Sequence, residues 1–364
     1  MKFTPFFEIH SALNAKMGLF GGYQMPIQYP GGVKYEHLTV RKNLGIFDIS
    51  HMGEFLVEGP QALDLLQYIC SNDITKLNPG KAQYNYLPNK TGGIVDDLIV
   101  YQLEKEKYLM VVNASNIFKD WKWINNFNKF FKVDISNISD TTSLLAIQGP
   151  KAIEAMQSLC ETDLKDLKNY CHTTTSFAGF KNILVATTGY TGSGGIEIYF
   201  NNEHAKTIWD RVMYAGSNYG ISPIGLAARD TLRIEMGYCL YGNEINDATS
   251  PTSAGLDWVT KKKHNFLNHK NYDETIQNES DKKLIGFEMD TRGIPRSGYI
   301  IYDKKENPIG KVTSGTQSPS LNKGIGLGYV KSDFSEIGKN LFIKIRDKFV
   351  PCTIVKVPFY KDKS

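Results

Sequence analysis

The chain has 364 residues, 41% of them hydrophobic and 12% aromatic, which is enough apolar material to build two or three packed domains. It carries 42 Lys and Arg against 38 Asp and Glu, and its lysines do not form the basic stripe with interleaved aromatics that is typical of nucleic-acid binding. The five cysteines are an odd number without C-x-x-C spacing, which argues against a disulfide framework and against a structural metal site. No apolar run approaches the roughly 18 residues that cross a bilayer, and the N-terminus has no signal or transit pattern, so we expect a cytoplasmic protein.

Two stretches of the chain repeat one pattern. EGPQALDLLQYIC at 58–70 and QGPKAIEAMQSLC at 148–160 share a Gly-Pro step, an apolar stripe at helical spacing and a terminal cysteine. A hairpin-like pair of apolar segments follows each, and then an amphipathic helix, expected at about 117–131 and 203–214. Two such ferredoxin-like βαββα copies predict antiparallel sheets with helices on one face, an α+β fold.

The rest of the chain has a different texture. A further helix is expected at roughly 224–236, and from about residue 284 six short apolar segments with glycine turns predict a small β-barrel or sandwich. The charged, Asn-rich segment 261–283 is interpreted as a linker. Gly18, Gly21, Gly22 and Pro26 predict a looped N-terminal part.

Two adjacent carboxylates interrupt an apolar strand in GGIVDDLIVY at 92–101. Side-chain alternation places Asp96 and Asp97 on opposite faces, so at most one of them faces a given pocket, and parity does not choose between them. Burial among Ile and Val raises the pKa of such a carboxyl, and a nearby cation or donor keeps it ionised, as a general base or electrostatic stabiliser requires. Two hydrated turn aspartates are the alternative, which the lack of a turn signal between them disfavours.

The glycine-rich GYTGSGG at 189–195 lacks the Lys-Ser/Thr of a phosphate loop and precedes a strand, so a hairpin turn is favoured over a nucleotide site. Glu197 follows it, on the opposite strand face from Ile196 and Ile198. A carboxylate there can accept two parallel hydrogen bonds from a planar heterocycle, although an exposed strand Glu is an equal alternative.

Arg229 and Arg233 lie four residues apart and share one helix face. Pairing with Asp230 or Glu235 within the helix is not expected on that face. A ligand carboxylate or Glu197 would therefore compensate these charges, unless each Arg forms an internal salt bridge. His51 is interpreted as a structural histidine, since a lone His beside apolar residues usually is.

Several stretches together resemble the aminomethyltransferase (T-protein) family of the glycine cleavage system. The matching runs include KMGLFGGYQMPIQY at 16–29, GIFDISHMGEF at 45–55, GGIVDDLIVY, TTGYTGSGGIEI at 187–198, GLAARDTLRIEMGYCLYGNEI at 225–245 and TSGTQSPSL at 313–321. The resemblance covers nearly the whole chain in order. It implies three domains around a central folate channel: a discontinuous folate-binding domain from 1–50 and 140–260, a second α+β domain at 51–139 that carries the catalytic Asp, and a jelly-roll-like β-barrel at 284–364.

The resemblance also implies a reaction. The carbon of the aminomethyl group on the dihydrolipoyl arm of the H-protein would pass to tetrahydrofolate, giving 5,10-methylenetetrahydrofolate, ammonia and dihydrolipoyl H-protein, with no metal, nucleic acid or membrane involved. It assigns the catalytic role to Asp97, pterin recognition to Glu197 and folate binding to Arg229. The remaining expected folate-binding residues are Tyr190, which would pack on the pterin, and Met52, Tyr84, Tyr101 and Asn113. Ser193 departs from the pattern, because many relatives carry Glu there.

Two other functions share this architecture. Folate-dependent demethylases resemble the family in fold but lack the paired Asp strand. Non-catalytic folate-binding relatives carry a Lys-Gly-Cys-Tyr run where this chain has MGYCLYGNE. Turnover with lipoylated H-protein discriminates between these alternatives, because a binding module would release no ammonia.

Overall fold

The computed structural model describes residues 1–261, 266–269 and 281–361, and the chain divides into two compact units. Unit 1 contains Met1–Leu87 and Asp96–Arg229, and unit 2 contains Pro88–Val95 and Asp230–Ser364. Strand β7 (Ile94–Glu104) and helix α7 (Leu226–Met236) each have residues in both units. Most of the linker expected at 261–283 lies outside the described residues.

The N-terminal part of unit 1 is more regular than the sequence predicted. Its elements are β1 (Lys2–Phe3), α1 (Phe7–Ala12), β2 (Lys16–Phe20), β3 (Tyr23–Gln28) and α2 (Gly32–Lys42), with the strands paired in the order β1-β3-β2. Gly21 and Gly22, at φ +56° and +86°, form the turn between β2 and β3. A two-residue hairpin turn of this kind needs positive φ at both positions, so these glycines indicate a hairpin and the looped prediction is wrong here.

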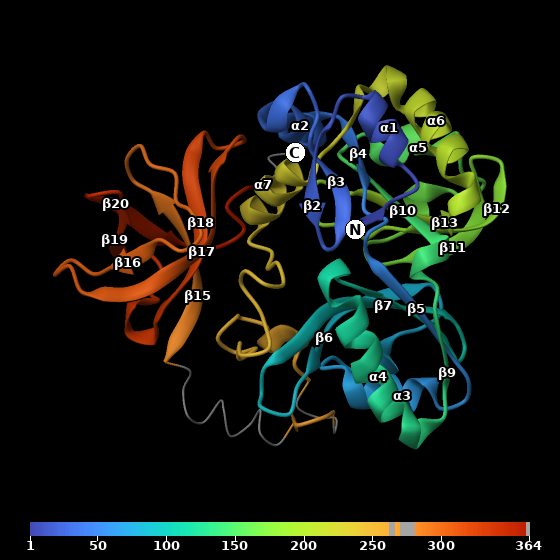
Figure 1. Cartoon of the computed structure of the whole chain (residues 1–364), viewed down its shortest axis with the longest axis horizontal. Coiled ribbons are helices and arrows are strands. Elements are labelled where there is room, and N and C mark those ends of the chain that lie inside the picture. The colour runs from blue at the N-terminus through green and yellow to red at the C-terminus, as the bar shows by residue number, and fades with distance from the viewer. Residues whose placement is uncertain (262–265, 270–280, 362–364) are drawn as a thin grey trace. The chain divides into compact units, whose positions relative to one another are not determined.

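The internal duplication is confirmed, with one more strand in each copy than predicted (Figure 1). The first copy is β5 (Gly53–Glu58), α3 (Ala62–Ile69), β6 (Lys81–Pro88), β7, β8 (Lys107–Val112) and α4 (Ile117–Phe131). The second is β10 (Thr142–Gln148), α5 (Ala152–Gln157), β11 (His172–Phe177), β12 (Phe180–Ala186), β13 (Gly195–Asn201) and α6 (Ala205–Gly216).

The two sheets have corresponding strand orders. These are β6-β7-β8-β5 and β11-β12-β13-β10, extended at the β5 side by β9 (Asp134–Asn137) and at the β10 side by β4 (Leu44–Asp48) and β14 (Ile221–Pro223). Helices α3 and α4 pack together beside the first sheet, and α5 and α6 beside the second (Figure 1). The second core contains Ile196 and Ile198 of β13 together with Trp209 of α6. Because strand side chains alternate, Glu197 and Tyr199 point to the face of β13 away from α6.

All six predicted strands of the C-terminal part are present and close a barrel in the order β15-β18-β17-β16-β19-β20. They are β15 (Lys282–Met289), β16 (Ile300–Tyr302), β17 (Pro308–Ser318), β18 (Lys323–Lys331), β19 (Asn340–Ile345) and β20 (Lys348–Val355). Phe287, Ile301, Ile343 and other apolar side chains fill the barrel. The α+β fold with a C-terminal β-barrel is therefore confirmed.

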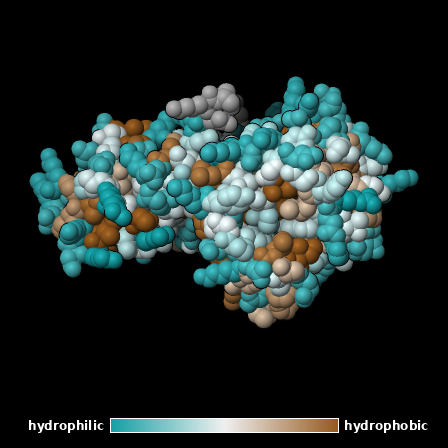
Figure 2. Space-filling view, turned by 90° about the horizontal axis from the view of Figure 1, so that it is seen from above, coloured by the Kyte–Doolittle hydropathy of each residue, from teal (hydrophilic) through white to brown (hydrophobic). Residues whose placement is uncertain are grey.

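The surface shows no continuous apolar band on the face drawn in Figure 2, where hydrophobic residues form separate small patches among hydrophilic ones. Among the helices in the described parts of the chain, none is both long enough and apolar enough to cross a membrane.

Candidate functional site

Asp97 lies on β7 of unit 1, and two side chains hold its carboxylate. Its Oδ2 accepts a hydrogen bond from the Tyr84 hydroxyl at 2.9 Å, and its Oδ1 accepts one from Asn113 Nδ2 at 2.9 Å. The side chain is half-buried. Burial, reinforced by the negative charge of Asp96, raises the pKa of Asp97 to about 7. Asp97 is thus a partly accessible carboxyl whose charge changes near neutral pH.

Asp96 points to the opposite side of β7, as alternation predicted. It is fully buried and accepts hydrogen bonds from the backbone N–H of Asn113 at 3.0 Å, from Asn113 Nδ2 at 2.9 Å and from Asn116 Nδ2 at 2.6 Å. Asn116 ends a 3₁₀ turn, η2 (Ala114–Asn116), directly before α4. Of the two aspartates, only Asp97 is therefore partly exposed.

The Asn113 side chain connects the pair. Its Nδ2 donates to Asp96 Oδ1, to the Asp97 backbone oxygen at 3.0 Å and to Asp97 Oδ1. Ionised carboxylates only accept hydrogen bonds, so the amide must turn its NH₂ group toward them. The orientation of Asn113 and that of Asp97 are consequently fixed together.

Glu197 lies on β13 in a buried network of hydroxyl groups. Its Oε2 accepts a hydrogen bond from Thr188, whose hydroxyl lies 2.9 Å from that of Tyr101. The Tyr101 hydroxyl in turn lies 2.9 Å from that of Tyr199. Burial raises the pKa of Glu197, whereas the hydrogen bond from Thr188 and the positive charge of Arg229 oppose this rise. The arrangement is a buried carboxylate with several hydroxyl partners, suited to a ligand that presents N–H donors.

The Arg229 guanidinium contacts the ring of Tyr190. The Arg229 guanidinium carbon lies 4.6 Å from the centroid of the Tyr190 ring, a cation–π geometry. Arg229 belongs to α7, and its charge opposes the rise that burial causes in the pKa of Glu197. The sequence expectation that Arg229 compensates Glu197 agrees with this attraction.

Arg233 has a different role from Arg229. It is buried in unit 2, where its Nε donates to Asp230 at 2.8 Å, its Nη1 to Glu244 at 2.7 Å and its Nη2 to Ser314 at 2.7 Å. The prediction that Asp230 does not fit this face is wrong, because an i, i+3 pair forms. Arg233 thus forms an internal salt bridge, which is the alternative that the sequence left open.

The Asp97 and Glu197 groups are linked through β7. Asp97 and Tyr101 lie four residues apart on the same face of this strand, which places their Cα atoms about 13 Å apart. Tyr101 reaches β13 by its hydroxyl. Strand β7 therefore carries both the Asp97 carboxylate and Tyr101, a member of the Glu197 network. Both residues lie in unit 1.

Family models and relatives agree on what this chain resembles. The model described as GCVT N-terminal domain matches residues 6–264, and the model described as glycine cleavage T-protein C-terminal barrel domain matches residues 282–361. The chain belongs to the glycine cleavage T-protein family. The aminomethyltransferase of Flavobacterium psychrophilum is 55% identical over 361 residues, covering 99% of this chain and 100% of the relative. That of Bacteroides fragilis is 52% identical over 367 residues with the same coverage.

A solved T-protein has the same fold. The crystal structure of aminomethyltransferase T of the glycine cleavage system from Bartonella henselae matches with a TM-score of 0.93 and 32% identity, covering 99% of this chain and 98% of that one. The family expected from the sequence is confirmed, and with it a transferase of the glycine cleavage system. The demethylase and non-catalytic alternatives are not favoured.

Met52 and His51 follow β4 in the chain, and His51 is close enough to Arg229 that, besides burial, this charge lowers its pKa. Met52 is half-buried in the turn between β4 and β5, and within the described ranges no hydrogen bond connects its side chain to either of the two carboxylate groups of the site. His51 is buried, which lowers its pKa to about 4, so it is neutral at pH 7. The ring of Phe20 packs against it edge-on at 5.4 Å, in agreement with a structural role.

Sequence reasoning missed Thr188 and Tyr199 of the Glu197 network. Tyr199 lies two residues after Glu197 and so shares its strand face, a signal that alternation provides. Thr188 directly precedes the GYTG turn. In the longer stretch GYTGSGG at 189–195, three glycines have positive φ: Gly192, Gly194 and Gly195. It leads into β13, which pairs antiparallel with β12, so the hairpin interpretation is confirmed.

Ser193 keeps a partner in the same turn. Arg41 Nη1 donates to the Ser193 hydroxyl and to the Thr191 backbone oxygen, each at 2.6 Å. The turn is thus tied to α2 through the Ser193 hydroxyl.

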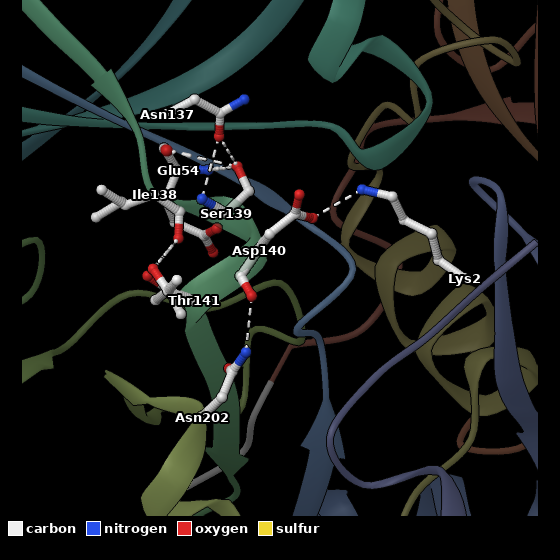
Figure 3. A network of polar contacts seen from close by, with 9 residues as sticks. Lys2, Glu54, Asn137, Ile138, Ser139, Asp140, Thr141 and Asn202 are labelled. Atoms are coloured by element: carbon white, nitrogen blue, oxygen red, sulfur yellow. Dashed lines mark hydrogen bonds and ion pairs between the residues drawn. The ribbon is translucent and has the colours of Figure 1, made fainter.

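A second polar cluster of unit 1 contains none of the predicted site residues (Figure 3). Lys2 pairs with Asp140 at 2.7 Å beside a pocket of about 250 Å³, and both side chains are exposed. In the same cluster the buried Glu54 receives no hydrogen bond on its carboxyl oxygens within the described residues, and burial raises its pKa well above the usual range. An exposed ion pair and a protonated carboxyl do not indicate a reactive site.

Across residues 1–261, 266–269 and 281–361, no three His, Cys, Asp or Glu side chains are grouped so as to hold a metal ion. The expectation of a metal-free site remains a prediction.

Proposed function

We propose that the protein transfers the aminomethyl carbon from the dihydrolipoyl arm of the H-protein to tetrahydrofolate. The products are 5,10-methylenetetrahydrofolate, ammonia and the dihydrolipoyl arm. The observation that carries the proposal is Asp97, a half-buried carboxylate held by Tyr84 and Asn113 on the strand that also reaches the Glu197 network.

The reaction forms two C–N bonds to the folate and breaks one C–S and one C–N bond. The two N–H hydrogens lost by the folate balance the proton gained by the sulfur and the proton gained by the departing ammonia. Positive charge develops on the aminomethyl carbon and its nitrogen as the C–S bond breaks. The ionised Asp97 carboxylate stabilises this charge and can accept a proton from the folate N–H.

Glu197 is proposed to bind the pterin edge. A carboxylate accepts two parallel hydrogen bonds from an N–H and an NH₂ group on one edge of a heterocycle. The residues present fit this ligand, because the carboxylate is buried, attracted by Arg229 and flanked by hydroxyl groups. Tyr190 would contribute its ring face, and Met52, Tyr84, Tyr101 and Asn113 complete the proposed folate site.

The proposed domain division takes 1–50 with 140–260 as the folate-binding domain, 51–139 as the domain that carries Asp97, and 284–364 as the barrel. The separate sheets of the two duplicated copies and the closed C-terminal barrel support this division.

Turnover with the two substrates tests the function. Aminomethyl-loaded H-protein and tetrahydrofolate are mixed with the protein, and ammonia and methylenetetrahydrofolate are measured together. We expect equal amounts of both. Folate binding without ammonia release would support a binding module, and methylenetetrahydrofolate formed from a methylated amine without H-protein would support a demethylase.

A further inference from the structure

Asp120 is a buried carboxyl that the proposed reaction does not use. It lies in the first turn of α4 and is fully buried. No N–H or O–H donor of the described residues reaches either of its oxygens. An ionised carboxylate in such a place would lack both water and hydrogen bonds, which costs several kcal/mol. Asp120 is therefore expected to be neutral.

Its neighbour is the carboxyl of Asp96, which lies close enough that the two groups shift each other's pKa. Asp120 lies one turn along α4 from Asn116, whose Nδ2 donates to Asp96 Oδ1 at 2.6 Å. Two carboxyl groups can share a hydrogen bond only if one of them carries the proton. Asp96 already accepts three N–H bonds, from the backbone and side chain of Asn113 and from Asn116, whereas Asp120 accepts none from the described residues. The donors stabilise the charge on Asp96, so the proton resides on Asp120.

The charges around the pair favour the same placement. Burial and then the negative charge of Asp96 raise the pKa of Asp120, and Asp97 adds to the rise while Lys119 opposes it. Asp120 thus stays protonated across the neutral range and can donate to a nearby acceptor.

A hydrogen bond from Asp120 to Asp96 would be connected to the Asp97 carboxylate through two further contacts. Asp96 holds the Asn113 amide by accepting from its backbone and its side chain. The same amide nitrogen donates to Asp97 Oδ1 and to the Asp97 backbone oxygen. Loss of the Asp120 donor would leave Asp96 a more mobile and more basic acceptor, and the Asn113 amide would lose its fixed orientation.

We propose that Asp120 is a positioning residue, which donates its proton to Asp96 and thereby fixes the Asn113 amide that orients Asp97. The proposal rests on the proposed function, in which Asp97 is the catalytic carboxylate. The competing role is purely structural, a tie that holds α4 on β7 and affects folding alone.

Two substitutions separate these roles. Asp120→Asn keeps a neutral side chain with an N–H donor toward Asp96, and Asp120→Ala removes the donor. We expect Asp120→Asn to retain most of the turnover and Asp120→Ala to lower kcat by about 10-fold at nearly unchanged KM for tetrahydrofolate. If both variants lose kcat equally, or if KM rises while kcat stays constant, the positioning role is contradicted.

Ile124→Ala is the matched control for packing. Ile124 lies one turn further along α4, is fully buried and makes no polar contact with the aspartates. Its truncation should lower the melting temperature at least as much as Asp120→Ala while keeping kcat within about 2-fold of wild type. A kcat that falls in step with the melting temperature in both variants would show that stability alone accounts for the loss.

A double variant tests whether Asp120 acts through Asp97. In an Asp97→Asn background the orientation of the carboxylate no longer matters, so adding Asp120→Ala should lower kcat by less than about 2-fold. A further 10-fold loss would mean that Asp120 acts by a separate route.

Infrared spectroscopy tests the proton directly and without substrates. The wild-type spectrum at pH 7 minus that of Asp120→Asn should contain the carbonyl band of one protonated carboxylic acid, and the subtraction removes bands from other neutral carboxyls such as Glu54. A difference spectrum without this band overturns the proposal even if the wild type turns over normally. Failure of the wild type to release ammonia would instead contradict the proposed function and leave the band unaffected.

Discussion

Asp97 owes its properties to three neighbours. Tyr84 and Asn113 donate to its two oxygens, and the charge of Asp96 on the other side of the strand adds to the rise in pKa that burial causes. The donors favour the ionised form while burial and Asp96 oppose it, so the carboxyl titrates near neutrality. Such a group can be charged when the transition state is cationic and still exchange a proton with the substrate.

The pH dependence of the reaction should show this titration. Asp97 is protonated below its pKa of about 7, and only the ionised form stabilises a cation. We therefore expect kcat/KM for tetrahydrofolate to rise with pH through about 7 and then to level off, since kcat/KM reports the free enzyme. The measurement is kcat/KM at saturating H-protein over a series of buffers. A profile that is flat through neutrality would mean that Asp97 does not titrate there.

Substitution of Glu197 tests the pterin contact. Glu197→Gln replaces one acceptor by a donor that would face a ligand donor. Tetrahydrofolate binding should weaken by on the order of 2 to 3 kcal/mol, because the ligand donors are left buried and unpaired. Calorimetric titration measures this loss. The variant should melt near the wild-type temperature without folate but show a smaller rise with it. Unchanged affinity would place the pterin elsewhere.

The residue types and their spacing singled out Asp97 and Glu197 in the sequence, but not the residues proposed to position them, such as Asp120. The strand alternation around Asp97 and Glu197 holds as expected. Asp120 was missed because it belongs to a helix that reads as an ordinary amphipathic one, and its pairing with Asp96 is a contact across 24 positions of the chain. The two carboxyls come close because α4 begins directly after Asn116, which bonds Asp96 on β7.

At the scale of elements, the apolar pattern found most strands and helices. It predicted the helix at 117–131, which is α4, and all six strands of the barrel. It missed β6 and β11, whose sequences KAQYNYLP and HTTTSF contain too many polar residues to stand out as apolar segments. Both are edge strands of their sheets, and the buried Asn85 of β6 is satisfied by accepting a hydrogen bond from the Asn72 backbone N–H at 3.0 Å.

The helix α7 shows why equal spacing does not imply an equal role. Arg229 and Arg233 lie one turn apart, but Arg229 packs on Tyr190 in unit 1 and Arg233 binds Glu244 in unit 2. Helical periodicity predicts on which face of the helix a residue lies. It does not predict the partner, which comes from a segment further along the chain, as Glu244 does for Arg233.

Substitution of Arg229 by Lys tests the contribution of α7 to folate binding. An ammonium keeps the charge but not the planar guanidinium that stacks on Tyr190. We expect Arg229→Lys to weaken tetrahydrofolate binding by about 10-fold, with little change in the folate-free melting temperature. Arg233→Lys provides the contrast, because loss of its buried network should lower the melting temperature instead. Equal effects of the two variants on folate affinity would contradict this division.

At the scale of the whole molecule, the sequence predicted the fold class and the duplication because both depend on repeated local patterns. The pairing of β4 with β10 and of β14 with β4 was not predictable in this way, since these contacts join segments about 100 or more positions apart along the chain. The resemblance to the T-protein family implied that 1–50 and 140–260 belong to one domain, which periodicity alone does not indicate.

The net charge of +4 bears on the proposed partner. If the H-protein is acidic, attraction between the two proteins accelerates their encounter, and salt screens this attraction over about 10 Å at 0.1 M. The apparent KM for H-protein should therefore rise with ionic strength. An apparent KM that stays constant from low to high salt would exclude a mainly electrostatic encounter.

The central claim is that Asp97, and not Asp96, acts on the substrate. Its most direct test is the turnover number of Asp97→Asn beside calorimetric titration of tetrahydrofolate into the same variant. We predict that kcat falls by about 100-fold or more while the folate affinity changes little, because the charge matters mainly in the transition state. Asp96→Asn should lose less turnover and more stability. A near-normal kcat in Asp97→Asn, together with an inactive but folded Asp96→Asn, would contradict the assignment.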